Sequence, residues 1–260
     1  MGTVSAPGGH EHRVATERHG HVLLIRMERP AKRNAVDAAM TTALDAALNE
    51  LDDDPDLRCG VLSGGPQAFC AGTDLTGGAG DPTPRGGPFG VVRRRRFTPL
   101  VAAVEGPALG GGFEIVLSCD LVVAGRSARF GLPEVTRGVV ANAGALFRAV
   151  QQLPAPVARD LLLTGRPLGA QRAYELGMLS EVVDDGGAES AALGLAAQIA
   201  ANAPVAVQET LRAAREIAGA ADERNWALSD EVNQRVLASA DRHEGVRAFL
   251  EKRPPQWSGR

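Results

Sequence analysis

The sequence predicts an α/β protein that ends in a helical segment. Short apolar runs typical of strands alternate with a helical pattern in the first third of the 260 residues. Helical periodicity dominates from Pro154 onward. Glycine, at 31 residues, is the compositional outlier, and it falls in clusters rather than at every third position. Clustered glycine excludes a collagen and indicates loops in which the backbone is exposed.

The first elements follow the order strand, helix, strand. Residues 21–27 form an apolar run that ends before Pro30, and we expect a strand there. Asn34 is expected to cap a helix whose apolar residues repeat at helical spacing and which ends before Pro55. Residues 59–63 form a second short apolar run. This order is typical of a crossover unit with parallel strands.

The middle of the chain combines a long irregular stretch with further short elements. Residues 76–90 are rich in Gly and Pro, and we expect a mobile surface loop without regular structure. Strands are expected at 99–104, 120–124 and 128–131, with a short apolar helix at 113–117. This part therefore continues the α/β pattern.

The remainder is predicted to be mostly helical, with one brief strand near residues 179–183. The expected helices are 154–163, 170–177, 189–217 and 221–252. We divide the chain into a flexible N-terminal tail (1–18), a core (19–200) and a helical C-terminal region (201–260). The last region is thin for an independent core, so we expect it to pack on the body or on another subunit.

Charge and composition exclude several classes of protein. The 28 Lys and Arg against 31 Asp and Glu leave a net charge of −3, too balanced for a protein that covers nucleic acid. No apolar run reaches the roughly 18 residues of a membrane span. Three cysteines without CxxC spacing favour a reducing, cytoplasmic compartment. Five histidines without an HExxH pattern predict no metal site.

Two stretches place small residues where backbone amides can be exposed. Residues 69–75 (Phe-Cys-Ala-Gly-Thr-Asp-Leu) follow a predicted strand, and residues 110–112 (Gly-Gly-Gly) precede a predicted helix. Two N–H groups that converge on one carbonyl oxygen form an oxyanion hole, which stabilises the charge that develops in thioester chemistry. The alternative interpretation is that these glycines only permit tight turns.

Two glutamates are candidates for acid–base chemistry. Glu114 lies two residues after the Gly triplet in an otherwise apolar stretch, so it either reaches solvent or is buried with a raised pKa. Glu134 follows Pro133 in a turn, and the alternative for it is a residue favoured at a helix start. Two carboxyl groups in one apolar pocket would repel each other, which keeps one of them protonated at neutral pH.

Four motifs, in this order and spacing, resemble those of the enoyl-CoA hydratase/isomerase (crotonase) family. They are residues 29–35 (RPAKRNA), 69–75 (FCAGTDL), 108–114 (ALGGGFE) and 130–134 (FGLPE). The resemblance covers about residues 20–258. It implies a crotonase-like spiral of ββα units with a C-terminal helical region that forms homotrimers, often paired into a dimer of trimers.

The resemblance also implies roles for the candidate residues. It assigns the oxyanion hole to the N–H groups of Ala71 and Gly111, and the acid–base pair to Glu114 and Glu134. Isomerases and many other members keep only one of the two acids, so both acids together favour enoyl-CoA hydratase activity, the reversible addition of water to trans-2-enoyl-CoA thioesters. No cofactor or metal is implied, because coenzyme A is part of the substrate.

The acyl-CoA is expected to contact a further set of residues. These are Lys32, Arg33, Gly72, Thr73, Asp74, Asn142, Phe249 and Lys252. Lys32 would lie near the ADP part of CoA, while Phe249 and Lys252 on the C-terminal helix would reach a ligand, including that of a neighbouring subunit. The alternative is that both lysines are ordinary surface cations. The arginine run 93–96 is interpreted as a solvated or CoA-phosphate-facing patch rather than a nucleic-acid site.

One segment departs from the pattern of typical hydratases. They have Pro-Gly-x-Gly-Gly where residues 141–145 read Ala-Asn-Ala-Gly-Ala. Asn142 stands where members similar to carnitinyl-CoA dehydratase have an acid, and residues 248–257 resemble that branch. Three alternatives therefore stay open: a carnitinyl-CoA dehydratase-like activity, isomerisation of an enoyl-CoA, or a non-catalytic protein that binds acyl-CoA.

Overall fold

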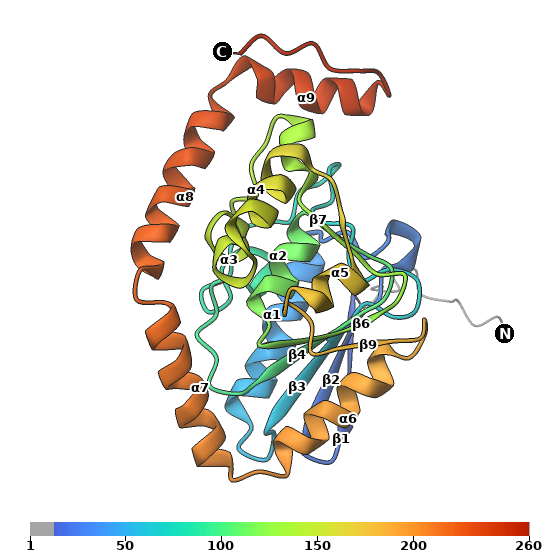
Figure 1. Cartoon of the computed structure of the whole chain (residues 1–260), viewed down its shortest axis with the longest axis vertical. Coiled ribbons are helices and arrows are strands. Elements are labelled where there is room, and N and C mark those ends of the chain that lie inside the picture. The colour runs from blue at the N-terminus through green and yellow to red at the C-terminus, as the bar shows by residue number, and fades with distance from the viewer. Residues whose placement is uncertain (1–12, 260) are drawn as a thin grey trace, which may run out of the picture.

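A six-stranded sheet forms the centre of the protein in a computed structural model that describes residues 13–259 (Figure 1). The strand order is β1-β2-β3-β4-β6-β9. β1 pairs antiparallel with β2, and the other neighbours are parallel. The strands are β1 (Val14–His19), β2 (Val22–Met27), β3 (Cys59–Ser63), β4 (Leu100–Val104), β6 (Leu121–Gly125) and β9 (Glu181–Val183).

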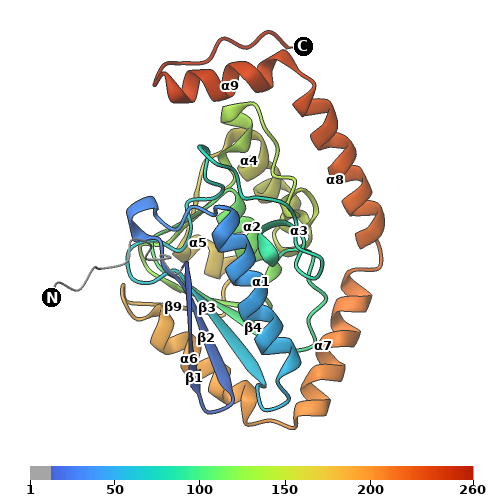
Figure 2. The ribbon, with the colours of Figure 1, turned by 180° about the vertical axis from the view of Figure 1, so that it is seen from behind.

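Each face of this sheet is covered by a helix, because successive side chains of a strand point to opposite faces. Leu23 and Ile25 of β2 join the core on the side of α1 (Ala38–Asp53). Leu24 of β2 joins a second core on the side of α6 (Ala188–Ala200). Figures 1 and 2, seen from opposite sides, show α6 and α1 on the two faces.

A second, smaller sheet positions the candidate site. It consists of β5 (Pro107–Leu109), β7 (Arg129–Gly131) and β8 (Leu168–Gly169), in the order β5-β7-β8. β5 leads directly into α2 (Gly111–Ser118), and β7 into the short 3-10 helix η3 (Pro133–Arg137). Because β5 and β7 are paired neighbours, the segments that carry Glu114 and Glu134 leave the same sheet side by side.

The remaining helices complete the body and form a C-terminal arm. The arm, defined here as α7, α8 and α9, extends along one flank and crosses one end of the molecule (Figures 1 and 2). The other elements are η1 (Pro30–Lys32), η2 (Pro88–Gly90), α3 (Ala145–Gln152), α4 (Ala155–Thr164), α5 (Ala170–Glu175), α7 (Pro204–Ala218), α8 (Asp222–Leu237) and α9 (Ala240–Leu250).

Two N-terminal expectations need correction. β1 occupies residues that we assigned to the flexible tail; its side chains are mostly exposed and polar, so it lacks the apolar pattern of a strand. The rest of that tail, residues 1–12, lies outside the described residues. Asn34 does not cap α1. Asp37 is the cap, and its carboxylate accepts a hydrogen bond from Met40 N–H at 2.8 Å.

Further corrections concern the C-terminal helices and the glycine-rich loop. The single helix expected at 189–217 is two helices, with a 107° bend before Pro204, which has no N–H to continue the first helix. Likewise, Ser239 caps α9 and divides the helix expected at 221–252. The stretch expected to be a mobile surface loop contains η2, and Phe89 within it is buried against the core. α3 was not predicted.

Within residues 13–259, no single helix combines the length and apolarity needed to cross a membrane. The bent pair α6 and α7 meets that test only when the two helices are taken together.

Candidate active site

The motif at residues 69–75 lies between two other backbone segments. On one side, Cys70 N–H donates to Pro107 O at 3.1 Å and Leu109 N–H donates to Cys70 O at 2.9 Å. On the other side, Val36 N–H donates to Gly72 O at 2.8 Å, and Asp74 N–H to Val36 O at 2.9 Å. These hydrogen bonds hold the motif beside the strand that leads into α2.

The hydrogen bonds decide which N–H group of this motif is available to a ligand. The N–H of Ala71, our expected donor, is engaged: it donates to Arg33 O at 2.9 Å. The N–H of Asp74 points to Val36, so the preceding N–H, of Thr73, points to the opposite side, where β5 enters α2. Among residues 13–259, the Thr73 N–H meets no hydrogen-bond acceptor. The structure therefore favours the N–H of Thr73 over that of Ala71 as the donor to a ligand.

The second N–H group belongs to Gly111, the first residue of α2. The first N–H groups of a helix have no partner within the helix, and that of Gly111 has none elsewhere in the part of the chain that the structure describes. A Cβ atom on Gly72 would lie 3.4 Å from Gly111 N and 2.9 Å from Leu109 O. Gly72 therefore allows a close approach that brings the two segments, and their free N–H groups, together.

Glu114 is buried close to the start of α2. The residue is only 3% exposed, and Glu114 Oε1 accepts a hydrogen bond from Ala145 N–H at 3.2 Å. Burial, followed by the charge of Glu134, raises the pKa of Glu114 to about 8. At neutral pH this carboxyl group can therefore hold a proton.

Glu134 lies on η3, at the same end of α2. Its Oε1 is 3.0 Å from the position that a Cβ on Gly110 would occupy. Its Oε2 is buried and, within the described residues, has no hydrogen-bond partner. Burial raises the pKa of Glu134 to about 7. A buried carboxylate oxygen without a partner, close to the start of α2, is available to hydrogen-bond a polar reactant.

A cavity of about 480 Å³ opens at the start of β5. Its lining includes Arg33, Asn34, Ala68 and Pro107. Arg33 and Lys32 are exposed at the end of η1, but only Arg33 is among the lining residues. Because Pro107 begins β5, the cavity opens beside the strand that leads to Gly111.

Asn34, which we expected to be a helix cap, instead connects segments that line this cavity. Its side-chain amide donates to the backbone oxygens of Gly64, Ala68 and Phe69, at 2.7, 3.0 and 3.1 Å. Its Oδ1 accepts from Arg29 N–H at 2.9 Å. The backbone of Asn34 is left-handed, with φ +54°, which Asn tolerates better than most residues. This tolerance of Asn for a left-handed backbone was the only signal in the sequence that Asn34 connects these segments.

Asp74 has a structural partner rather than a free carboxylate. Its Oδ2 forms an ion pair with Arg29 Nη1 at 2.7 Å, and its Oδ1 accepts from Thr76 N–H at 2.8 Å. The Thr76 hydrogen bond and then the Arg29 guanidinium lower the pKa of Asp74 to about 2. Arg29, which we did not select as a site residue, therefore ties η1 to the motif that carries Thr73.

The other expected substrate contacts lie on the side of the site that faces the arm. The carbonyl of Asn142 accepts from Ser229 Oγ of α8 at 3.0 Å. Phe249 is exposed on α9, with the Arg137 guanidinium 4.9 Å from its ring centre, and Lys252 is exposed just after α9. Because α9 contacts η3, these residues approach Glu134 rather than the cavity lined by Arg33.

Neither thiol nor metal chemistry has support in the described part of the chain. Burial raises the pKa of the Cys70 thiol to about 12, so this cysteine beside the site is protonated at neutral pH. Within residues 13–259, no group of three or more His, Cys, Asp or Glu is arranged to hold a metal ion.

Comparison with known proteins identifies the family. Residues 17–260 match the family model described as Enoyl-CoA hydratase/isomerase. Enoyl-CoA hydratase EchA19 of Mycobacterium tuberculosis is 42% identical over 94% of this chain and 96% of its own length. Carnitinyl-CoA dehydratase of Proteus mirabilis is 37% identical, over 93% and 96%. A solved structure of a carnitinyl-CoA dehydratase from Mycobacterium avium superposes with a TM-score of 0.90 and 43% identity, over 95% and 99%. The chain belongs to the enoyl-CoA hydratase/isomerase family.

Proposed function

We propose that this protein is an enoyl-CoA hydratase that adds water reversibly to trans-2-enoyl-CoA thioesters. The observation that carries the proposal is the pair of buried glutamates with raised pKa values at the N-terminal end of α2. Both lie beside Gly111, whose N–H is free among the described residues. The names of the two curated relatives above, a hydratase and a dehydratase, support the same reversible reaction.

The thioester oxygen would accept hydrogen bonds from the N–H groups of Gly111 and Thr73. As water attacks C3, electrons of the C2–C3 double bond move toward the thioester, and negative charge develops on its oxygen. Donors that are already in place stabilise this charge without reorganisation, and the loss of one such donor typically costs about 100- to 1,000-fold in kcat. The positive end of the α2 dipole adds to the same effect.

Glu114 and Glu134 would share the proton transfers. Mutual repulsion and burial leave one proton on the pair near neutral pH, so one carboxyl group is a base while the other is an acid. The carboxylate removes a proton from the attacking water, and the carboxylic acid delivers its proton to C2. The overall reaction adds one water, changes no oxidation state of the protein and needs no cofactor.

The cavity lined by Arg33 would take the CoA part of the substrate. The Arg33 guanidinium, which lines this cavity, and the exposed Lys32 beside it in the sequence are cations suited to phosphate groups. Gly72, Thr73 and Asp74 would border the pantetheine arm and the thioester, and Asn142 the reacting carbons. Phe249 and Lys252 would contact the acyl-CoA from the arm.

We also propose that the protein assembles as a homotrimer or a dimer of trimers through the region 201–260, while residues 19–200 form the core. Support comes from α7, which buries no residue and leaves Val205 and Ile217 strongly exposed. A cytoplasmic location is supported by Cys59, Cys70 and Cys119, which are all free.

Dehydration of a 3-hydroxyacyl-CoA, such as a carnitinyl-CoA, is the second candidate. The two relatives named as carnitinyl-CoA dehydratases favour it. The chemistry is that of the same site in reverse, so the two candidates differ in the acyl group rather than in the catalytic residues.

The test is a panel of CoA esters with the purified full-length protein. Hydration of crotonyl-CoA, followed as the loss of enoyl-thioester absorbance, is the expected result. Turnover of L-carnitinyl-CoA with little activity on crotonyl-CoA would favour the second candidate. Reaction of a 3-enoyl ester alone would contradict both, and tight binding without turnover would indicate a binding protein.

A further inference from the structure

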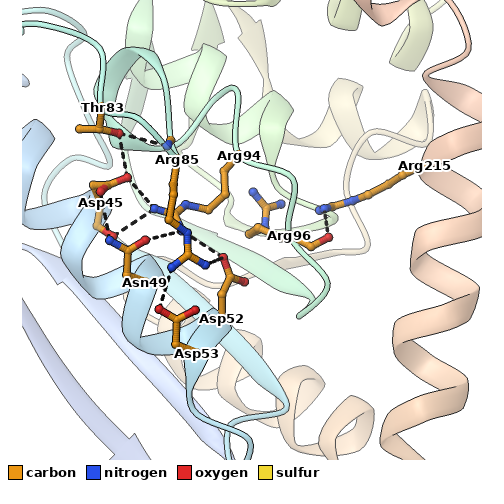
Figure 3. Close-up of polar contacts among 10 residues, drawn as sticks. Asp45, Asn49, Asp52, Asp53, Thr83, Arg85, Arg94, Arg96 and Arg215 are labelled. Carbon is orange, nitrogen blue, oxygen red and sulfur yellow. Dashed lines mark hydrogen bonds and ion pairs between the residues drawn. The ribbon is translucent and has the colours of Figure 1, made fainter.

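The glycine-rich stretch contains a loop that is fastened to α1 at both ends. We define the Phe89 loop as residues 83–94. At its start, Thr83 Oγ1 donates to Asp45 Oδ1 at 2.7 Å. At its end, Arg94 Nη2 donates to the same carboxylate oxygen at 2.6 Å. Figure 3 shows Asp45 between these two side chains. One α1 carboxylate thus holds both ends of the loop.

Arg94 makes the second fastening strong. Its Nη1 donates to Asn49 Oδ1 at 2.8 Å and to Asp52 Oδ2 at 3.0 Å, both on α1. The Arg94 side chain is almost completely buried. Hydrogen bonds of a buried, charged group contribute more than neutral ones and are costly to break. The two partners and Arg94 lie together in Figure 3.

The interior of the loop is compact. Thr83 and Gly87 exchange two backbone hydrogen bonds, at 3.0 and 2.9 Å, and Arg93 N–H donates to Gly86 O at 2.8 Å. Gly90 packs against α1, since a Cβ there would lie only 2.4 Å from Thr41 O. The loop is therefore a preformed unit, and its position relative to α1 is determined.

This unit presents Phe89 to the candidate site. Phe89 has a left-handed backbone, with φ +60° and ψ 5°, a conformation that is strained for a bulky residue. The residue is only 7% exposed. Its ring lies against Gly111, because a Cβ on Gly111 would be 2.6 Å from Phe89 Cζ. Strain of this kind persists where surrounding contacts enforce it, and it is concentrated at functional sites.

The Phe89 ring lies beside Gly111, at the end of β5 opposite to the residue that lines the cavity. The cavity is lined by Pro107, the first residue of β5, and β5 leads through Leu109 to Gly111. A thioester oxygen bound to the Gly111 N–H would therefore place the neighbouring acyl group close to the Phe89 ring. A ring held at this place would occupy the volume that a longer acyl chain needs.

We propose that Phe89 is the specificity-determining residue that closes the acyl site and restricts the enzyme to short acyl chains. The inference rests on the proposed function, because it concerns the acyl group of an enoyl-CoA. The clamp on Asp45 has a positioning role: it keeps the ring in place against the strain of the Phe89 backbone.

The experiment compares kcat/KM for a C4 and a C10 trans-2-enoyl-CoA in the wild type, Phe89→Ala and Phe89→Leu. The wild type is expected to prefer C4. Both variants are expected to raise the C10-to-C4 ratio, by about tenfold or more for Phe89→Ala, since a change of one methylene in an apolar pocket is already worth about 10- to 200-fold. Arg95→Ala is the matched control: it follows the loop directly, its side chain is 90% exposed, and among the described residues its ion pair is with the equally exposed Glu223, at 3.7 Å.

Each outcome either supports or overturns the proposed role of Phe89. A residue with only a packing role would lower kcat/KM for both substrates by the same factor and leave their ratio unchanged, which would overturn the proposal. Equal activity of the wild type on both chain lengths would overturn it as well, without any variant. Phe89→Leu keeps an apolar side chain in the core, so it provides the comparison if Phe89→Ala does not fold. If the wild type hydrates no 2-enoyl ester at all, the proposed function itself fails.

Discussion

The α/β body buries its apolar residues in its own core, whereas the C-terminal arm leaves several of its apolar residues exposed. Leu23, Leu24 and Ile25 of β2 are completely buried, whereas α7 buries no residue. Val205 and Ile217, near the two ends of α7, are 72% and 80% exposed. The body therefore has its own core, while the arm presents apolar side chains that the chain itself does not cover.

Arginines supply several of the polar contacts between the two regions. Arg215 of α7 donates to Asp120 Oδ1 at 2.5 Å and to Arg96 O at 2.7 Å, and Figure 3 shows the contact with Arg96. Arg93 forms an ion pair with Asp230 of α8 at 2.8 Å, and its guanidinium lies 4.1 Å from the Trp226 ring centre. The candidate catalytic groups therefore lie in the body, whereas arginine contacts help to orient the arm.

The strongest test of this division is a substitution in the body. Glu114→Gln removes a proton-transferring group, and we expect kcat on crotonyl-CoA to fall about 100- to 10,000-fold. Glu209→Gln on α7 is the control, because Glu209 is exposed and pairs only with Arg212, at 2.7 Å. Equal activity of the Glu114→Gln variant and the wild type would show that the buried pair is not catalytic.

A second body substitution addresses the oxyanion hole. A Cβ introduced by Gly111→Ala would lie 2.6 Å from Phe89 Cζ, so the ring or the start of α2 must move. We expect a loss of about 100-fold or more in kcat, as for a misplaced oxyanion donor. Gly194→Ala on α6 is the matched control, since its Cβ would meet no atom within 4 Å. Activity within twofold of the wild type for Gly111→Ala would show that the Phe89 ring yields to the new methyl group and that the start of α2 keeps its place.

The buried carboxyls also predict how stability depends on pH. The pKa of Glu114 is raised from 4.5 to about 8 in the folded protein, so between these values the folded state binds more protons than the unfolded state. The contribution of this group to stability is therefore present below about pH 4.5 and is lost as pH rises toward 8, at about 1.4 kcal/mol per unit of pKa difference.

Thermal melts of the wild type and Glu114→Gln measure this effect. The Tm of the wild type is expected to fall more steeply from pH 5 to pH 9 than that of the variant, which cannot ionise. Parallel pH profiles of the two Tm values would mean that Glu114 is not held protonated by its surroundings.

The smallest expected effect on stability lies in the arm. Ile217→Ser replaces an exposed apolar side chain, so we expect the free energy of unfolding of an isolated chain to change by less than about 0.5 kcal/mol. The assembly proposed above should nevertheless weaken, which multi-angle light scattering measures as a lower mass at the same concentration. Ala227→Ser, also exposed on the arm, is the milder comparison. An unchanged mass would place the subunit contacts elsewhere.

Much of the site was predictable because it is encoded in short, local patterns. A Gly triplet before an apolar stretch predicted the start of α2, while the choice of the Gly111 N–H came from the resemblance to the family. The Pro133-Glu134 pair was expected in a turn, and the structure has it at the start of the short helix η3, which was our alternative. Ala71 was the wrong choice of second donor, because the pairing with Arg33 and Val36, about 35 to 40 residues earlier in the chain, decides which N–H remains free.

The sequence alone determined the positions of most strands and helices and of the candidate acidic residues. These follow from the alternation of apolar residues and from the positions of glycine and proline, which depend on neighbours along the chain. The tertiary structure decided the pKa values of Glu114 and Glu134, the choice of Thr73, the role of Asn34 and the contact of Phe89 with Gly111. These properties arise from burial and from contacts between distant segments, and neither exists until the chain has folded.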